Sequence, residues 1–292
     1  MAQGAYRRVL HKGRRDVVNE YINLIKKPDL KNPTLLVTWV MDSRSLGASI
    51  TDFLIKNLEN YVFCEIEPVE FFTLSGVNIE DDFVQFPESR FYACPDEDLV
   101  LFKSTPPHHE WHTFLNLVLD VAQKYCNIGE VYTMGGMVSL AAHTSPRQFF
   151  STSNSRSMKK ALSQYLIARD TNYETPPGGK PTLNSYMLWC AKQRSIPGAN
   201  LWVPVPFYLL SSGDPVAQKK IIEFLNRKFS LNMDLSDIDN TIYRTNERIN
   251  LLREEKPEIN EYISKIESNA RLTTEENEKL LKEVEQFLKD IR

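Results

Sequence analysis

The chain has 292 residues, of which 42% are hydrophobic and 25% charged, and its formal net charge is −3. A chain of this length buries about three quarters of its unfolded surface, so its core needs neither disulfides nor a structural metal. The near-neutral charge gives no reason to expect a nucleic acid or a membrane as partner. The longest apolar run, residues 201–210, contains two prolines and is far shorter than the roughly 20 residues of a membrane-spanning helix.

Four cysteines stand singly along the sequence, at Cys64, Cys94, Cys126 and Cys190. Their wide spacing is not that of a zinc knuckle or a disulfide framework and favours free thiols in a reducing compartment. The first 15 residues are basic, but no apolar segment or cleavage site follows them, so no secretory signal is indicated. We therefore expect a cytoplasmic protein.

The charges divide the chain into two parts. Residues 237–292 hold 14 acidic and 10 basic side chains and no glycine, while the preceding residues are close to neutral. A glycine-free segment rich in charge is typical of helices. We therefore distinguish a body, residues 1–236, expected to be an α/β domain, from a tail, residues 237–292, expected to be a charged helical extension.

Short apolar runs alternate with amphipathic patterns in the body. Runs at residues 35–40 and 62–66 enclose a helical pattern that begins at Leu46, and runs at residues 99–102 and 131–134 enclose another that includes Trp111. Strand, helix and strand in this order, found twice, predict an α/β fold with a mainly parallel sheet. A later helix is expected to begin with Asp214 as its N-cap and Pro215 as its first residue.

The tail is expected to form helices that break near Pro257 and again at residues 268–273, before a capping box of Thr273 and Glu276. Apolar side chains form a stripe on each side of these breaks. Burying one large aliphatic side chain contributes roughly 1.5–3 kcal/mol, so the stripes should cover the body, each other or a neighbouring subunit. The interaction surface is expected to include Ile238, Ile242, Ile249, Leu252, Leu281, Val284, Leu288 and Ile291.

The common signatures of nucleotide-dependent enzymes, serine hydrolases and zinc peptidases are absent from the sequence. The densest group of metal-ligand types is His108, His109, Glu110 and His112. A structural zinc site normally needs four protein ligands, and no other histidine or cysteine stands at ligand spacing to complete this group. We therefore favour a helix start with solvated imidazoles, and we expect no metal and no cofactor.

Polar residues and glycines follow two of the predicted strands. In open α/β sheets, ligands bind beyond the carboxyl ends of the strands. A ligand crevice could therefore be lined by Asp42, Ser43, Arg44, Gly135, Gly136, His143 and Thr144. The simpler alternative is that Asp42 caps its helix and that the two glycines only form a tight turn.

The order of motifs along the chain resembles the proteasome assembly chaperone 2 family of bacteria and archaea. The resemblance covers about residues 30–255. It depends on Trp39 with Asp42 and Gly47, on Glu67-Pro68-x-Glu70-Phe71-Phe72, on Pro106-Pro107-His108 with Trp111 and Phe114, on Gly135-Gly136, on His143-Thr144-x-Pro146, on residues 196–208 and on Asp214-Pro215.

The resemblance implies a three-layer α/β fold related to purine nucleoside phosphorylases, a helical C-terminal extension and homo-oligomers. It also implies a similarity to chaperones that guide proteasome assembly. Two features depart from the family pattern. Ser43-Arg44 replaces a small residue and glycine, and the chain ends in Asp290-Ile291-Arg292 without a penultimate tyrosine. We therefore do not expect the C-terminus to dock into a proteasome pocket.

Two hypotheses follow. The leading one is a non-enzymatic, oligomeric protein-binding or assembly-chaperone-like protein, whose partner is another protein or a second copy of itself. The alternative is a nucleoside- or small-molecule-binding protein or enzyme that uses the crevice at the sheet edge. In that alternative Asp42 or His143 would act as the acid or base, and the glycine pair would admit the substrate.

Overall fold

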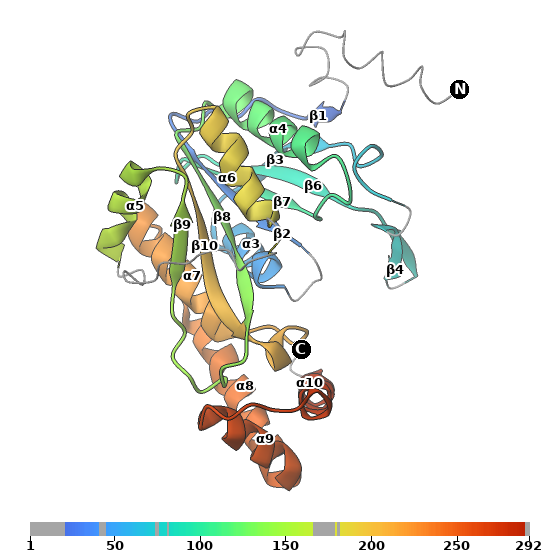
Figure 1. Ribbon diagram of the computed structural model, residues 1–292. Helices are drawn as coiled ribbons and strands as arrows, with labels where there is room; N and C mark the ends of the chain where they lie inside the picture. The colour runs from blue at the N-terminus through green and yellow to red at the C-terminus, as the bar shows by residue number, and fades with distance from the viewer. Residues whose placement is uncertain are drawn as a thin grey trace.

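A mixed sheet of eight strands forms the centre of the protein, with the strand order β1-β3-β6-β7-β2-β8-β10-β9. The computed structural model describes residues 21–40, 45–73, 76–80, 82–165, 179 and 182–289 (Figure 1). The strands of this sheet are β1 (Ile22–Leu24), β2 (Thr34–Trp39), β3 (Tyr61–Ile66), β6 (Ser89–Cys94), β7 (Leu99–Ser104), β8 (Glu130–Ser139), β9 (Phe150–Ser153) and β10 (Gly198–Pro206). The four central strands, β7, β2, β8 and β10, are parallel, and the outer pairings are antiparallel.

Helices cover both faces of the sheet, which confirms the predicted three-layer α/β fold. One face carries α3 (Leu46–Asn57) and α7 (Pro215–Phe229), and the other carries α4 (Trp111–Val121), its π-helical continuation η2 (Ala122–Cys126) and α6 (Leu183–Gln193). Because side chains alternate along a strand, Leu36 of β2 packs in the core under α3 and α7, while Leu35 and Val37 pack in the core under α4 and α6.

In each of the two predicted strand–helix–strand units, the two strands are not neighbours in the sheet. The chain leaves β2 through α3 and returns in β3, but β6 and β7 lie between these two strands in the sheet. The second unit, from β7 through α4 to β8, likewise passes over β2. Local hydrophobic patterns predict the strands but not which strands pair, because pairing is decided by segments that are distant in the sequence.

The tail forms three helices, α8 (Ser236–Glu255), α9 (Pro257–Glu267) and α10 (Thr274–Leu288). Both predicted breaks and the predicted capping box at Thr273 are confirmed. In Figure 1, α8 runs alongside α7, and the tail then extends beyond the sheet with α9 and α10. Helix α8 packs on α7, and α10 packs on α8 and on the short turn η4 (Phe207–Leu209) that follows β10.

The apolar stripes of the tail are largely buried inside this chain. Ile238, Ile249, Leu252, Val284 and Leu288 belong to the same core as α3 and α7, and Ile242 packs against that core. Helix α10 buries Leu280 rather than the predicted Leu281, because the buried side chains recur every four residues at Leu280, Val284 and Leu288. Ile291 lies outside the described residues. The stripes therefore join the tail to the body.

A separate hairpin projects from the loop between β3 and β6. Its strands are β4 (Asn78–Glu80) and β5 (Phe83–Gln85), which pair only with each other, and Figure 1 shows it standing away from the layers. Elsewhere at the sheet margin, α5 (Arg156–Leu162) and the turn η3 (Ser163–Tyr165) follow the edge strand β9. Among the described residues, no helix is both long enough and apolar enough to cross a membrane.

The start of α3 approaches β2 so closely that it requires a glycine. A Cβ on Gly47 would lie 2.7 Å from the backbone oxygen of Trp39. Although alanine normally favours a helix over glycine by about 1 kcal/mol, crowding a packed site costs about 1–3 kcal/mol. We expect Gly47→Ala to lower the free energy of unfolding by about 1 kcal/mol or more, measured by urea denaturation.

Gly135→Ala is the matched control, because the nearest atom to its added Cβ would be 3.8 Å away. Its stability should stay within about 0.5 kcal/mol of the parent value or rise slightly. A Gly47→Ala protein as stable as this control would contradict the close approach.

Candidate functional site

The structure describes four of the seven residues predicted to line one crevice: Gly135, Gly136, His143 and Thr144. Asp42, Ser43 and Arg44 lie outside the described residues. Gly135 and Gly136 do not form a tight turn after a strand, but lie within β8 opposite Trp202 and Val203 of β10. The apolar run predicted at residues 131–134 is thus only the first part of a strand that continues to Ser139.

The two glycines face opposite sides of the sheet, and close packing requires a glycine only at Gly136. A Cβ on Gly136 would lie 2.9 Å from Cγ2 of Val205, so the glycine allows the neighbouring strand's side chain and Leu46 of α3 to come close. On the opposite face, the amide of Asn184 lies nearest to Gly135. Asn184 accepts a hydrogen bond from Nε1 of Trp39 at 2.7 Å and donates one to Asn200. A protein side chain therefore lies where the glycine was expected to admit a substrate.

His143 and Thr144 lie in the loop after β8, where the body meets the tail. The Tyr208 hydroxyl accepts a hydrogen bond from the backbone N–H of His143 at 2.6 Å and lies 2.8 Å from its Nδ1. Oγ1 of Thr144 donates to Glu267 of α9 at 3.1 Å. Both η1 and η2 nitrogens of Arg253 from α8 also donate to that carboxylate. These contacts join the loop after β8 to η4 and to two tail helices.

A buried ion pair lies at the centre of this junction. Nε of Arg147 is 2.8 Å from Oδ2 of Asp214, and the two side chains are only 3% and 1% exposed. The other carboxylate oxygen of Asp214 accepts hydrogen bonds from the backbone N–H groups of Val216 and Ala217, as predicted for the N-cap of α7. Nη1 of Arg147 donates to the carbonyls of Ala142 and Ser145 in the loop. We call residues 142–147 with Tyr208, Asp214, Arg253 and Glu267 the junction cluster.

Burial sets the electrostatics of the junction cluster. It lowers the pKa of His143 to about 4, with Glu267 opposing this shift and the positive charges of Arg253 and Arg147 adding to it. Burial alone would raise the pKa of Glu267, but hydrogen bonds from Arg253 and Thr144 hold that pKa below its usual value. Burial also raises the pKa of Tyr208. A neutral, covered histidine hydrogen-bonded to a neutral tyrosine is suited to fixing a loop and poorly placed to exchange protons with a substrate.

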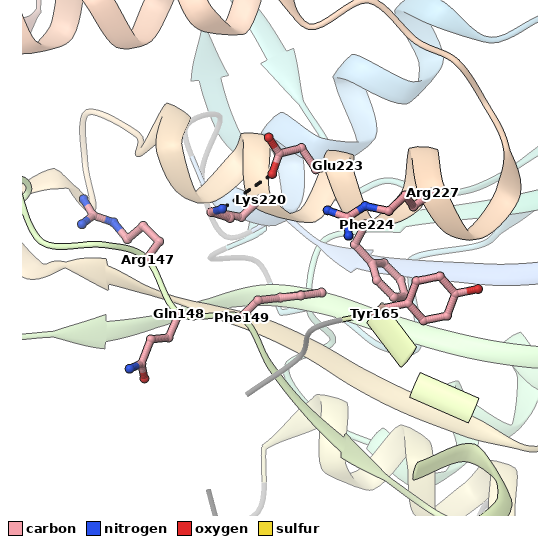
Figure 2. A pocket seen from close by; sticks show the side chains of 8 residues that line it. All are labelled: Arg147, Gln148, Phe149, Tyr165, Lys220, Glu223, Phe224 and Arg227. Atoms are coloured by element: carbon pink, nitrogen blue, oxygen red, sulfur yellow. Dashed lines mark ion pairs between the residues drawn. The ribbon is translucent and has the colours of Figure 1, made fainter. Parts of the chain in front are cut away.

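A cavity of about 330 Å³ opens between α7 and the chain that enters β9. Figure 2 shows the rings of Phe149, Phe224 and Tyr165 at one wall and the charged groups of α7 above them. The Phe224 ring centroid lies 5.2 Å from that of Phe149 and 5.3 Å from that of Tyr165. The aromatic wall is thus contributed by α7, by the loop before β9 and by η3.

The cavity carries more basic than acidic groups. Lys220, Arg227 and Arg147 line it together with one carboxylate, that of Glu223. Nζ of Lys220 is 3.7 Å from that carboxylate, whereas Arg147 is neutralised by Asp214. Sequence analysis did not find this cavity, because its residues come from three separate segments that show no common motif.

The histidine group after Pro107 is not arranged as a metal centre. Nδ1 of His108 lies 3.0 Å from the backbone nitrogen and 2.9 Å from Oγ1 of Thr73, and His112 lies against Tyr186 and Trp189. Within the described part of the chain, no three histidine, cysteine or carboxylate side chains are gathered as metal ligands.

Comparison with known proteins identifies the family. Residues 45–253 match the model of the PAC2 family. The chain belongs to the PAC2 family. This confirms the resemblance in the sequence, although no curated protein matches the chain. The matched segment begins at α3 and ends within α8, so the last two tail helices lie beyond it.

Solved structures share this PAC2 fold at low sequence identity. A protein of unknown function from Corynebacterium glutamicum ATCC 13032 has 19% identity and a TM-score of 0.70, over 85% of this chain and 96% of that one. A proteasome-assembly chaperone homologue from Mycobacterium tuberculosis has 19% identity and a TM-score of 0.65, over 79% and 99%. PbaB, an archaeal proteasome activator from Pyrococcus furiosus, has 19% identity and a TM-score of 0.64, over 80% and 98%.

The buried ion pair of the junction cluster should contribute much more to the stability of the protein than an exposed ion pair does. Replacing Arg147 with methionine leaves the Asp214 carboxylate buried without its cation, a change that costs about 3–5 kcal/mol. Lys56→Met is the control, because Lys56 pairs with Asp237 of the tail while both side chains are about 70% exposed. We expect that substitution to cost less than about 1 kcal/mol. Equal losses in urea denaturation would contradict the role given to Arg147.

His143 should make the protein less stable in mild acid. Its pKa is about 4 in the folded protein against an ordinary value of 6.5, so the unfolded chain binds a proton first as the pH falls. The resulting stabilisation is complete above pH 6.5 and is lost towards pH 4, by about 2 kcal/mol between pH 7 and pH 5.

This pH dependence can be assigned by substitution. Over the same interval His143→Gln should lose about 2 kcal/mol less stability than the parent, whereas the exposed His109→Gln should behave like the parent. The carboxylate of Glu267 titrates below this pH interval, since its pKa lies below its ordinary value of 4.5. Parallel pH profiles for His143→Gln and the parent would contradict the assignment.

Proposed function

We propose that this PAC2-family chain is a non-enzymatic, homo-oligomeric protein-binding protein that acts as an assembly chaperone in the cytoplasm. The observation that carries the proposal is the family match over residues 45–253. Structural neighbours that include a proteasome-assembly chaperone homologue and a proteasome activator support a role in protein association. All four cysteines are buried free thiols, which suits a reducing compartment.

The junction cluster supports a binding role better than a catalytic one. His143, the candidate acid or base among the described residues, is buried, and its pKa of about 4 leaves it neutral at physiological pH. Its hydrogen bonds go to Tyr208 of the same chain. The cluster therefore fixes the tail on the body, and the tail in turn offers its outer surface to a partner.

The tail surface available for a partner is the outer side of α8. The apolar stripe first expected to bind a partner faces the body, but Tyr243 and Leu251 are 66% and 47% exposed on the same helix. They are eight residues apart and therefore lie close to one side of the helix. We propose that this side of α8 contacts the partner protein.

We expect the double variant Tyr243→Ser, Leu251→Ser to lose a partner that co-purifies with the parent chain from its native host, while keeping its melting temperature. Trp189→Ser is the control, because Trp189 of α6 is also 47% exposed but lies on the opposite face of the sheet. Quantitative mass spectrometry of the three purifications measures the effect. Equal recovery of every co-purifying protein would contradict the proposed tail surface.

A thermal-shift screen tests the alternative of a small-molecule site. The parent chain is expected to show no shift with nucleosides, inorganic phosphate or divalent metal ions, whereas a saturating ligand at 100 times its Kd stabilises by about 2.7 kcal/mol. A reproducible rise of several degrees with any of these would favour the nucleoside- or small-molecule-binding alternative over the proposal.

A further inference from the structure

The hairpin of β4 and β5 exposes an unusual amount of apolar surface. Ile79 and Phe83 are 74% and 72% exposed, and Val84 and Phe86 are also more than half exposed. Ile79 lies opposite Val84 across the hairpin, whereas Phe83 lies opposite Glu80 and projects from the other face. An isolated two-stranded hairpin is marginally stable in water, and exposed apolar surface of this extent marks an interaction site. We call residues 77–86 the arm.

The arm is also acidic. Its sequence contains Glu80, Asp81 and Asp82, and no lysine or arginine occurs between residues 57 and 89. The strand β5 itself, residues 83–85, carries no charge, although charges are the usual protection of a free strand edge. A surface that complements the arm therefore needs apolar contacts together with positive charge.

The same chain carries such a surface at the other margin of the sheet. The cavity beside β9 has a wall of three aromatic rings and the exposed cations Lys220 and Arg227. Helix α5, which leads into the turn that supplies Tyr165, contains Arg156, Lys159 and Lys160 and no acidic residue. The cavity volume of about 330 Å³ is large enough to admit a phenylalanine side chain.

The arm cannot reach the cavity of its own chain. It joins β3 to β6 on one side of the sheet, whereas the cavity adjoins β9 at the opposite edge. Five strand intervals separate β6 from β9, which corresponds to about 24 Å. Figure 1 shows the hairpin and α5 on opposite sides of the molecule.

From this complementarity we propose that the arm of one copy docks in the aromatic, basic cavity between α7 and β9 of a second copy. Phe83 or Phe86 contacts the rings of Phe149 and Phe224, and Asp82 at the turn of the hairpin meets Lys220 and Arg227. The contact joins two different surfaces, so a pair of copies keeps one free arm and one free cavity, and the assembly closes into a ring or grows as a chain. The inference rests on the homo-oligomer of the proposed function and names its interface.

Two double variants test the two surfaces of this interface separately. The arm variant carries Phe83→Ser and Phe86→Ser, and the cavity variant carries Lys220→Glu and Arg227→Glu. The substituted arm side chains are exposed, and so are those of the cavity variant, so both proteins should keep the parent circular dichroism and melting temperature. Ile79→Ser with Val84→Ser gives a second arm variant, and Trp189→Ser and Lys192→Glu on α6 are the matched controls.

Light scattering after size exclusion, at equal protein concentrations, gives the readout. The parent and both controls should be oligomeric, and each interface variant alone should have the protomer mass of 33.8 kDa. An equimolar mixture of the arm and cavity variants should give a dimer of twice that mass, because an intact arm and an intact cavity then meet once. High salt should weaken the parent assembly, since ionic contacts at a protein surface are screened.

The results that would contradict the proposals can be distinguished from one another. A parent chain that is monomeric at every concentration would overturn the homo-oligomer of the proposed function together with its interface. An oligomeric parent whose mass is unchanged in both variants, or variants that stay monomeric when mixed, would overturn only the docking of arm and cavity. A nucleoside or phosphate that stabilises the parent but not the cavity variant, with oligomer mass unchanged, would assign the cavity to a small ligand instead.

Discussion

The buried ion pair between Arg147 and Asp214 is the interaction on which the rest of the structure depends. Desolvating two charges is costly, and such a pair is tolerated only when further hydrogen bonds satisfy both groups. Here the carboxylate also caps α7, and the guanidinium holds two carbonyls of the loop after β8. One pair therefore sets the start of a core helix and the shape of the loop that positions His143 and Thr144 against Tyr208 and Glu267.

This arrangement makes the tail part of the core. One apolar cluster continues from Leu36 in β2 through Ile221 in α7 to Leu252 and Val284 in the tail. Ion pairs that join Lys56 to Asp237 and Lys219 to Asp239 supplement this contact at the surface. The PAC2 family match ends at residue 253, within α8, yet the packing continues through α9 and α10. The helices beyond the match thus complete a core that the family segment begins.

The exposed surfaces of the chain differ from the crevice that the sequence suggested. The glycines, the histidine and the threonine that suggested a ligand crevice are used for strand packing and for the body–tail contact. Apolar side chains instead reach solvent on the arm and on the outer side of α8, and basic and aromatic groups surround the cavity beside β9. These surfaces suit association with proteins, whereas His143 and Thr144 are hydrogen-bonded within the chain.

The sequence alone determined the apolar strands and their alternation with helices, the helix breaks of the tail, the caps at Asp214 and Thr273, and the PAC2 resemblance, because each depends on residues close together in the chain. Only the tertiary structure decided that β6 and β7 separate β3 from β2 and that Gly135 and Gly136 lie inside a strand. It also showed that Leu280, not Leu281, is buried and that Arg147 pairs with Asp214. These features depend on strand pairing and on contacts between distant segments, and no local pattern records the energy of such contacts.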